Sequence, residues 1–140
     1  MPIERNADLK PYHTFGVSAR AAALAGFASE AELRALLNEP TLLGLDRLIL
    51  GGGSNLLFTR DWPGVVLRND VPGIEVLSED DERVTVRAGA GTVWHDLVLH
   101  TVAQGWGGLE NMSLIPGRVG AGPMQNIGAY GTELKDHFDH

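Results

Sequence analysis

The chain has 140 residues, a formal net charge of −7 and no cysteine. This length allows one ordinary domain or two small lobes, and 44% hydrophobic with 21% charged residues is typical of a globular protein rather than a disordered one. The negative charge argues against a nucleic-acid binder, because such proteins neutralise phosphates with lysine and arginine. The lack of cysteine excludes disulfides, a thiolate nucleophile and a cysteine-ligated metal within these residues.

The first ten residues lack the apolar core of a signal peptide, and no apolar run reaches membrane length. We therefore expect a cytoplasmic protein that does not bind a membrane. Glycine is the unusual component, with 18 residues that cluster at 51–53, at 89 and 91, between 105 and 108, and between 117 and 131. Clusters of glycine between apolar runs indicate functional turns in a folded domain rather than a linker.

The first half of the chain predicts alternating strands and one helix. Ser29 and Glu32 have the S-x-x-E spacing of a capping box, which predicts a helix that ends before Pro40. Short apolar runs predict strands at 21–27, 47–50 and 65–67, the last of them after a turn at 62–64.

From residue 71 the pattern changes to a hairpin, a helix and a long glycine-rich segment. Strands are expected at 74–77 and 84–88, joined by the acidic turn 79–82. Four adjacent carboxylates can hold calcium, but the spacing does not match a calcium loop, so a solvated hairpin tip is favoured. A second helix is expected at about 93–104, with Thr92 as N-cap, Gly105 at the C-cap and one apolar stripe made of Val93, Trp94, Leu97, Val98, Thr101 and Val102. The whole order predicts an α+β protein, with two lobes that meet near residue 70.

The loop Gly51-Gly52-Gly53-Ser54-Asn55 follows a predicted strand and is the first candidate site. Backbone N–H groups in such a turn can approach an anion closely. No lysine follows, as a Walker A loop would require, and Leu56 with no helix signal behind it excludes the Rossmann fingerprint. For this loop alone, phosphate binding and an ordinary glycine turn both stay open.

The segment 106–131 is the second candidate, because a connector of this length without strong periodicity tends to be functional. Asn111, Ser113, Gln125 and Asn126 lie in it among glycines, prolines and small apolar residues. Amide side chains in such a loop suit a planar ligand with donors and acceptors at its edge, such as a flavin. The alternative is a buried loop whose amides satisfy their own backbone.

Four stretches carry a family resemblance: TFGV, LGGGSNLLF, AGAGTVWHDLV and GLENMSLIPGRVGAGPMQNIGAYGTEL. In this order and spacing, from about Leu9 to the end, they resemble the UDP-N-acetylenolpyruvoylglucosamine reductase (MurB) family. The GGGSN run alone is weak, whereas IPGRVG leading into QNIGAYG is specific.

The resemblance implies a two-lobed α+β FAD-binding fold of the vanillyl-alcohol-oxidase (PCMH) type, truncated in the second lobe. Residues 1–70 would form the first FAD-binding lobe and residues 71–140 the start of the second, with the substrate domain absent. The implied activity is reduction of UDP-N-acetylglucosamine enolpyruvate to UDP-N-acetylmuramate in peptidoglycan precursor synthesis, with non-covalent FAD and with NADPH as hydride donor. A monomer is expected.

The resemblance also implies a cofactor site. Gly52, Gly53, Ser54 and Asn55 would cradle the pyrophosphate, with Gly51 and Leu56 beside them. The flavin end would be lined by Pro116, Gly117, Val119, Gly120, Ala121, Gln125, Asn126, Gly128, Ala129, Tyr130 and Gly131.

No catalytic residue is expected in this chain, because the family's catalytic arginine, proton-donor serine and assisting carboxylate lie downstream. We therefore expect an inactive flavin-binding fragment, cut at the start of a strand after Leu134. Two alternatives are a non-catalytic nucleotide- or flavin-binding module and a related flavin oxidase of the same fold.

Histidines near the end and on the second helix raise the question of a metal. His95 and His100 are five residues apart and are interpreted as surface or packing residues. A zinc site at the end of the chain is the less favoured alternative to a solvated strand start, so no metal is expected; its candidate ligands would be Glu133, Asp136, His137, Asp139 and His140.

Overall fold

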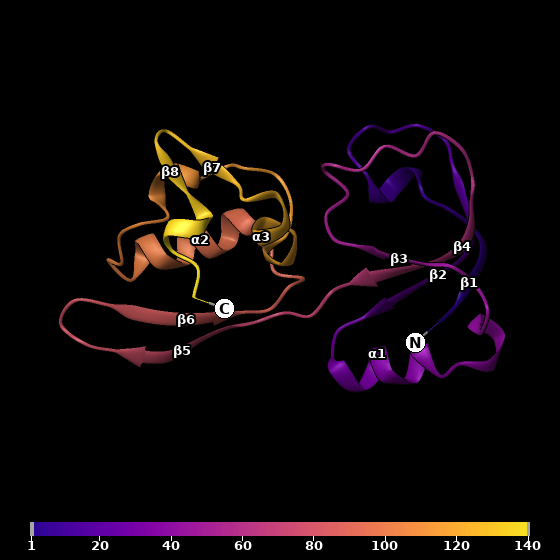
Figure 1. The fold of residues 1–140 in the computed structure, drawn as a ribbon, viewed down its shortest axis with the longest axis horizontal. Helices are drawn as coiled ribbons and strands as arrows, with labels where there is room; N and C mark the ends of the chain where they lie inside the picture. The colour runs from indigo at the N-terminus through magenta and orange to yellow at the C-terminus, as the bar shows by residue number, and fades with distance from the viewer. Residues whose placement is uncertain (1, 140) are drawn as a thin grey trace. The chain divides into compact units, whose positions relative to one another are not determined.

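The computed structural model describes residues 2–139, which divide between Val71 and Pro72 into two units (Figure 1). The expected division lay one residue earlier. No helix within the described residues has the length and apolar character that crossing a membrane would require.

The first unit is built on a four-stranded sheet of order β1-β2-β4-β3 (Figure 1). Its strands are β1 (Glu4–Asp8), β2 (Arg20–Phe27), β3 (Arg47–Leu50) and β4 (Trp62–Asn69). β4 pairs in parallel with both β2 and β3, whereas β1 is antiparallel to β2. The carboxyl ends of the three parallel strands therefore lie at one edge of the sheet, where α/β sheets commonly bind ligands.

Two apolar clusters cover the two faces of this sheet. Neighbouring β4 residues point to opposite faces, so Val66 belongs to one cluster and Val65 to the other. The cluster around Val65 is closed by Leu36 of helix α1 (Glu30–Leu37), which lies along one side of the sheet (Figure 1). The cluster around Val66 is closed by Leu9 and Phe58, which come from the loops on the other side. Both loops are thus fixed by burial against the sheet.

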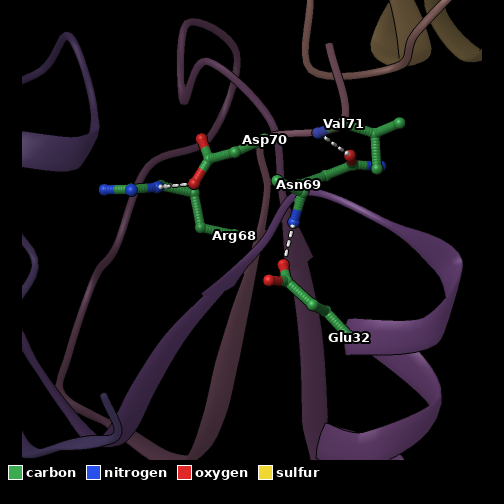
Figure 2. Close-up of polar contacts among 6 residues, drawn as sticks. Glu32, Arg68, Asn69, Asp70 and Val71 are labelled. Carbon is green, nitrogen blue, oxygen red and sulfur yellow. Dashed lines mark hydrogen bonds and ion pairs between the residues drawn. The ribbon is translucent and has the colours of Figure 1, made fainter. Parts of the chain in front are cut away.

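The start of α1 follows the predicted capping box with one change. The Glu32 backbone N–H donates to Ser29 Oγ at 3.2 Å, as expected for an N-cap serine. The Glu32 carboxylate accepts from the N–H of Ala28 at 2.6 Å, one residue before the N-cap. Figure 2 shows the same carboxylate directed toward Asn69 at the end of β4.

The strands predicted at 21–27 and 47–50 are confirmed, but two features of the sheet were not predicted correctly. The turn predicted at 62–64 is wrong, because β4 begins at Trp62. The pairing with β2 passes from Ala21–Trp62 to Ala23–Val65, so Pro63 and Gly64 form a bulge, a site that tolerates proline. Strand β1 was missed because only Ala7 of its five residues is buried.

The second unit starts with a hairpin of β5 (Ile74–Glu79) and β6 (Val84–Ala88), followed by α2 (Trp94–Ala103), and both predicted elements are confirmed. The remainder contains short elements: 3-10 helices at Glu110–Met112, Val119–Ala121 and Leu134–Asp136, α3 (Gly122–Gln125), β7 (Gly128–Ala129) and β8 (Thr132–Glu133). The core of this unit is made of Trp94, Leu97, Val98, Met112 and Leu134.

The ends of α2 differ from the prediction. The N-cap is Val93 rather than Thr92, and the Thr92 hydroxyl instead donates to the carbonyl of Gly73 at 3.3 Å. The C-cap is Gln104, and Gly105 follows it with φ +79°. Val93 and Val102, which were assigned to the apolar stripe, are 45% and 50% exposed.

The strand start expected after Leu134 is also wrong. Residues Leu134–Asp136 form a 3-10 helix with a reciprocal capping box, in which the Glu133 N–H donates to Asp136 at 3.2 Å. The spacing of Glu133 and Asp136 satisfies the first turn of this helix and ends strand β8.

Candidate functional site

The glycine loop lies at the carboxyl end of β3 and packs on the segment Tyr12–Thr14. Gly53 is buried with φ +64°, and a Cβ at this position would overlap the Tyr12 carbonyl oxygen and stand 2.7 Å from Cα of His13. The Thr14 N–H donates to the carbonyl of Gly53 at 3.1 Å. Glycine at 53 is therefore required both by the left-handed backbone and by the close approach of the second segment.

His13 forms part of the support beneath this loop. Its ring is 6% exposed, packs edge-on against Phe58 with centroids 5.3 Å apart, and places Nε2 3.1 Å from the carbonyl oxygen of Val17. Nδ1 has no hydrogen-bond partner within residues 2–139. His13 thus joins the TFGV stretch to the core under the loop.

The loop has donors to offer to an anion. Within residues 2–139, the N–H groups of Gly52, Gly53 and Asn55 donate to no backbone carbonyl. No helix follows the loop before β4, in contrast to a Rossmann turn. Backbone N–H groups on a tight left-handed turn form the kind of concave donor set that binds phosphate. Leu56 points the other way, since it packs on the apolar cluster around Val66.

A cation that sequence reasoning missed lies beside the loop. Arg68 is paired in the β3–β4 register with Leu50, the residue just before the loop. Its Nε donates to Asp70 at 2.7 Å, as Figure 2 shows, and its guanidinium lies 5.2 Å from the centre of the Tyr12 ring. Asp70 approaches Gly26 so closely that a Cβ there would stand 2.8 Å from Oδ2. Neither the pairing nor the ring contact has a signal in the sequence.

In the second unit, the segment 89–93 runs antiparallel to 117–120. The Val119 N–H donates to Thr92 at 2.9 Å, and the Gly120 N–H donates to Ala90 at 3.0 Å. A Cβ on Gly120 would stand 2.6 Å from Cβ of Ala90. The N–H groups of Val119 and Gly120 are therefore used within the chain, and close approach explains the glycine at 120.

The two amide residues predicted for the flavin end are also engaged by the chain. The Asn126 side chain donates to Glu133 at 3.3 Å and accepts from the N–H of Lys135 at 3.1 Å, and its backbone has φ +43°. Gln125 Nε2 donates to the carbonyl of Ala121 at 3.4 Å. Both amides thus bond within their own segment, but both residues are exposed, unlike those of the buried loop in the alternative interpretation.

The QNIGAYG stretch ends in a tight β7–β8 turn. Tyr130 has φ +53° and Gly131 φ +84°, the signs found at both centres of a type I′ hairpin turn, and Tyr130 is 90% exposed. A Cβ on Gly128 would stand 2.7 Å from the carbonyl oxygen of Thr132, so glycine is needed there as well.

Two pockets of the second unit involve predicted site residues. An open pocket of about 460 Å³ is lined by Asn126, Gly128, Ala129, Gly131, Thr132, Glu133, Lys135 and Asp136. At its rim, the hydrogen bond and ion pair with Lys135 lower the pKa of Glu133, so this carboxylate stays charged. A larger cavity of about 850 Å³ lies between the β5–β6 hairpin and α2, and Val119 is the predicted site residue that lines it.

Residues 2–139 contain no group of three or more histidine, cysteine, aspartate or glutamate side chains arranged to hold a metal ion. His137 Nε2 lies 2.9 Å from the Thr132 hydroxyl, and His140 is outside the described residues. His100 packs against Trp106, and His95 contacts Ser113.

Comparison with known proteins agrees with the resemblance. The chain matches the family described as FAD binding domain over residues 21–140. It is 51% identical over 138 residues to a UDP-N-acetylenolpyruvoylglucosamine reductase of Pseudomonas fluorescens and 54% identical over 138 residues to one of Chromobacterium violaceum. These alignments cover 99% of this chain but 41% and 40% of the two relatives, so the chain spans about two fifths of their length.

A solved structure agrees as well. UDP-N-acetylenolpyruvylglucosamine reductase (MurB) from Thermus caldophilus matches with a TM-score of 0.72 and 31% identity, over 97% of this chain and 46% of that one. The resemblance and the α+β fold of FAD-binding type are thereby confirmed. The chain belongs to the FAD binding domain family, and its relatives in that family are UDP-N-acetylenolpyruvoylglucosamine reductases.

Proposed function

We propose that the chain is the FAD-binding part of a UDP-N-acetylenolpyruvoylglucosamine reductase and that its glycine loop holds the cofactor's pyrophosphate. The observation that carries the proposal is the set of N–H groups of Gly52, Gly53 and Asn55, which donate to no backbone carbonyl within residues 2–139. They follow the carboxyl end of β3, where Arg68 is the register partner of Leu50, the residue just before the loop. Several N–H donors at one place suit a diphosphate, and the Arg68 guanidinium, which is already paired with Asp70, is a further donor near the loop.

The flavin end is assigned to the residues of 116–131 named above. Gly117 and Gly120 are fixed by hydrogen bonds to Trp94 and Ala90, so they would present a rigid surface. Tyr130 stands out on the β7–β8 turn, where its ring is free to cover a planar ligand. A bound, non-covalent FAD would supply hydride transfer from NADPH to the enolpyruvyl group of the UDP-sugar; with a proton added to the adjacent carbon, the product would be UDP-N-acetylmuramate for peptidoglycan synthesis.

The role of this chain is then to bind and orient the cofactor rather than to move protons. The family resemblance places none of the catalytic residues within 1–140, and the relatives are more than twice as long. We therefore propose that the chain alone does not turn over the enolpyruvyl sugar. We also propose a cytoplasmic location, because NADPH and UDP-sugars are cytoplasmic metabolites. The monomeric state remains part of the proposal, and gel filtration of the purified chain would test it.

The test is a titration of the purified chain with FAD, in which quenching of the flavin fluorescence reports binding. Riboflavin is titrated in the same way, and ADP is tested as a competitor of FAD. Saturable binding of FAD, weaker binding of each half and loss of binding in Gly53→Ala are expected. The proposal would be overturned if neither the chain nor the protein expressed from the complete reading frame bound FAD. If that longer protein binds FAD but does not oxidise NADPH with the enolpyruvyl sugar, the non-catalytic module is favoured; oxygen consumption would favour the oxidase.

A further inference from the structure

The first two residues of α2 hold the segment Met112–Gly117 at several atoms. The buried Trp94 indole Nε1–H donates to the Met112 carbonyl at 2.8 Å, and the Trp94 backbone N–H donates to the Gly117 carbonyl at 3.0 Å. Between these two points, His95 Nδ1 lies 3.2 Å from the Ser113 hydroxyl and 3.3 Å from the backbone nitrogen of Leu114. The segment 112–117, which leads into the proposed flavin end, is thus held by hydrogen bonds to the first turn of α2.

The contact with Leu114 determines which form of His95 is present. A backbone N–H can only donate, so Nδ1 must carry no proton and the imidazole must be neutral, with its hydrogen on Nε2. A proton on Nδ1 would place two N–H groups against each other. With Nδ1 unprotonated, the Ser113 hydroxyl, 3.2 Å away, is able to donate to the same nitrogen.

Leu114 has an unusual backbone that requires such a restraint. Its φ is +62°, which a leucine rarely adopts, and its side chain is 76% exposed. Burial of the side chain therefore does not hold this conformation. The hydrogen bond to His95 is the contact of the Leu114 N–H that restrains this turn. Ile115 follows Leu114, and Pro116 and Gly117 come next.

We propose that His95 is a positioning residue of the cofactor site: its neutral imidazole holds Leu114 in the left-handed conformation and so sets the direction in which Pro116 and Gly117 reach the flavin. This inference rests on the proposed function. It assigns to Trp94 and His95 the positioning of the segment 112–117, which neither the glycine loop nor the QNIGAYG stretch provides.

The first test measures the FAD dissociation constant of variants. His95→Ala is expected to weaken binding about five- to tenfold, the effect of one lost hydrogen bond. His95→Asn, whose amide oxygen can occupy the position of Nδ1, should stay within about twofold of the wild type. Leu114→Gly in the His95→Ala background should restore most of the affinity, because glycine adopts positive φ without strain.

His100→Ala is the matched control, since His100 lies on the same helix and contacts Trp106 instead. It should leave the affinity for FAD unchanged. An equal loss in His100→Ala and His95→Ala, or no rescue by either the Asn or the Gly substitution, would overturn the positioning role.

A second measurement does not depend on FAD. The nitrogen chemical shifts of the His95 ring in the cofactor-free chain should report an unprotonated Nδ1, and the Leu114 amide should exchange slowly in the wild type and rapidly in His95→Ala. A ring protonated on Nδ1 would overturn the inference. A wild-type chain that shows both signals but binds no FAD would instead overturn the proposed function, so the two failures are distinguishable.

Discussion

Gly53 and Tyr12 are in backbone contact: a Cβ on Gly53 would overlap the Tyr12 carbonyl oxygen, and the next neighbour, Cα of His13, would be 2.7 Å away. Two segments forty residues apart in the sequence therefore determine one turn. The contact occupies the side of Gly53 that faces the core. It leaves the N–H groups of the loop available for a ligand.

Gly53→Ala should destabilise the first unit and abolish FAD binding. The added methyl group meets backbone atoms that cannot move independently of the sheet, and the left-handed φ adds strain. A loss of roughly 3 kcal/mol or more in the free energy of unfolding is expected from strain and overlap together. Thermal or urea unfolding followed by circular dichroism would measure it.

Gly16→Ala is the matched control. Gly16 has nearly the same φ, +63°, but a Cβ there would meet no atom within 4 Å. Only the backbone strain remains, so a loss of about 1 kcal/mol with normal FAD binding is expected. Equal losses for the two variants would show that the contact with Tyr12 has no energetic role.

Trp94→Phe should destabilise the second unit while keeping an aromatic ring in its core. The substitution removes the indole N–H and leaves the buried carbonyl of Met112 without its donor, which costs about 1–3 kcal/mol. Trp106→Phe is the comparison, because Trp106 is only half-buried and contacts His100. Chemical unfolding of both variants should give the larger loss for Trp94→Phe, and the reverse order would contradict the role of this hydrogen bond.

Ser29→Ala should shorten or loosen α1. The Ser29 hydroxyl accepts from the N–H of Glu32, and loss of an N-cap acceptor typically lowers the free energy of unfolding by about 1 kcal/mol. Ser29→Gly at the same position should lose only about 0.3 kcal/mol, because glycine tolerates the extended N-cap backbone and leaves the helix end open to water. Identical results for alanine and glycine would argue against capping.

The hairpin between β5 and β6 should loosen in acid. Hydrogen bonds from the backbone N–H groups of Glu82 and Arg83 lower the pKa of Asp80 below its ordinary value. Because the pKa is lower in the folded chain, the carboxylate stabilises the turn above the ordinary aspartate pKa, and this contribution is lost as the pH falls through the lowered pKa. The protection factors of the Glu82 and Arg83 amides, measured against the intrinsic exchange rate at each pH, should fall over that range.

Asp80→Asn should show reduced protection of the Glu82 and Arg83 amides already at neutral pH. Asp81→Asn should not, since both amides donate to Asp80. If both variants exchange like the wild type, the turn is held by the strand pairing alone.

Local patterns in the sequence were enough to predict most of the elements. Apolar runs predicted β2, β3 and the β5–β6 hairpin, and the S-x-x-E spacing predicted the start of α1, because each depends on neighbours within a few residues. β1 was missed because its pairing with β2 stabilises it without an apolar pattern of its own. Trp62, Pro63 and Gly64 were predicted to form a turn because proline and glycine usually end a strand. Here they lie at a bulge within β4, where a strand tolerates proline.

The same distinction applies to the candidate site. The sequence by itself determined that glycine loops, an amide-bearing segment and a family resemblance occur together, since these are properties of residue order. Only the tertiary structure decided that Gly53 rests on Tyr12, that Arg68 lies beside the loop, and that His95 fastens Leu114. Each of these relationships joins residues that lie far apart in the sequence, through strand register, backbone contact or a single hydrogen bond. Such contacts are specified by packing of the whole unit, and no local pattern encodes them.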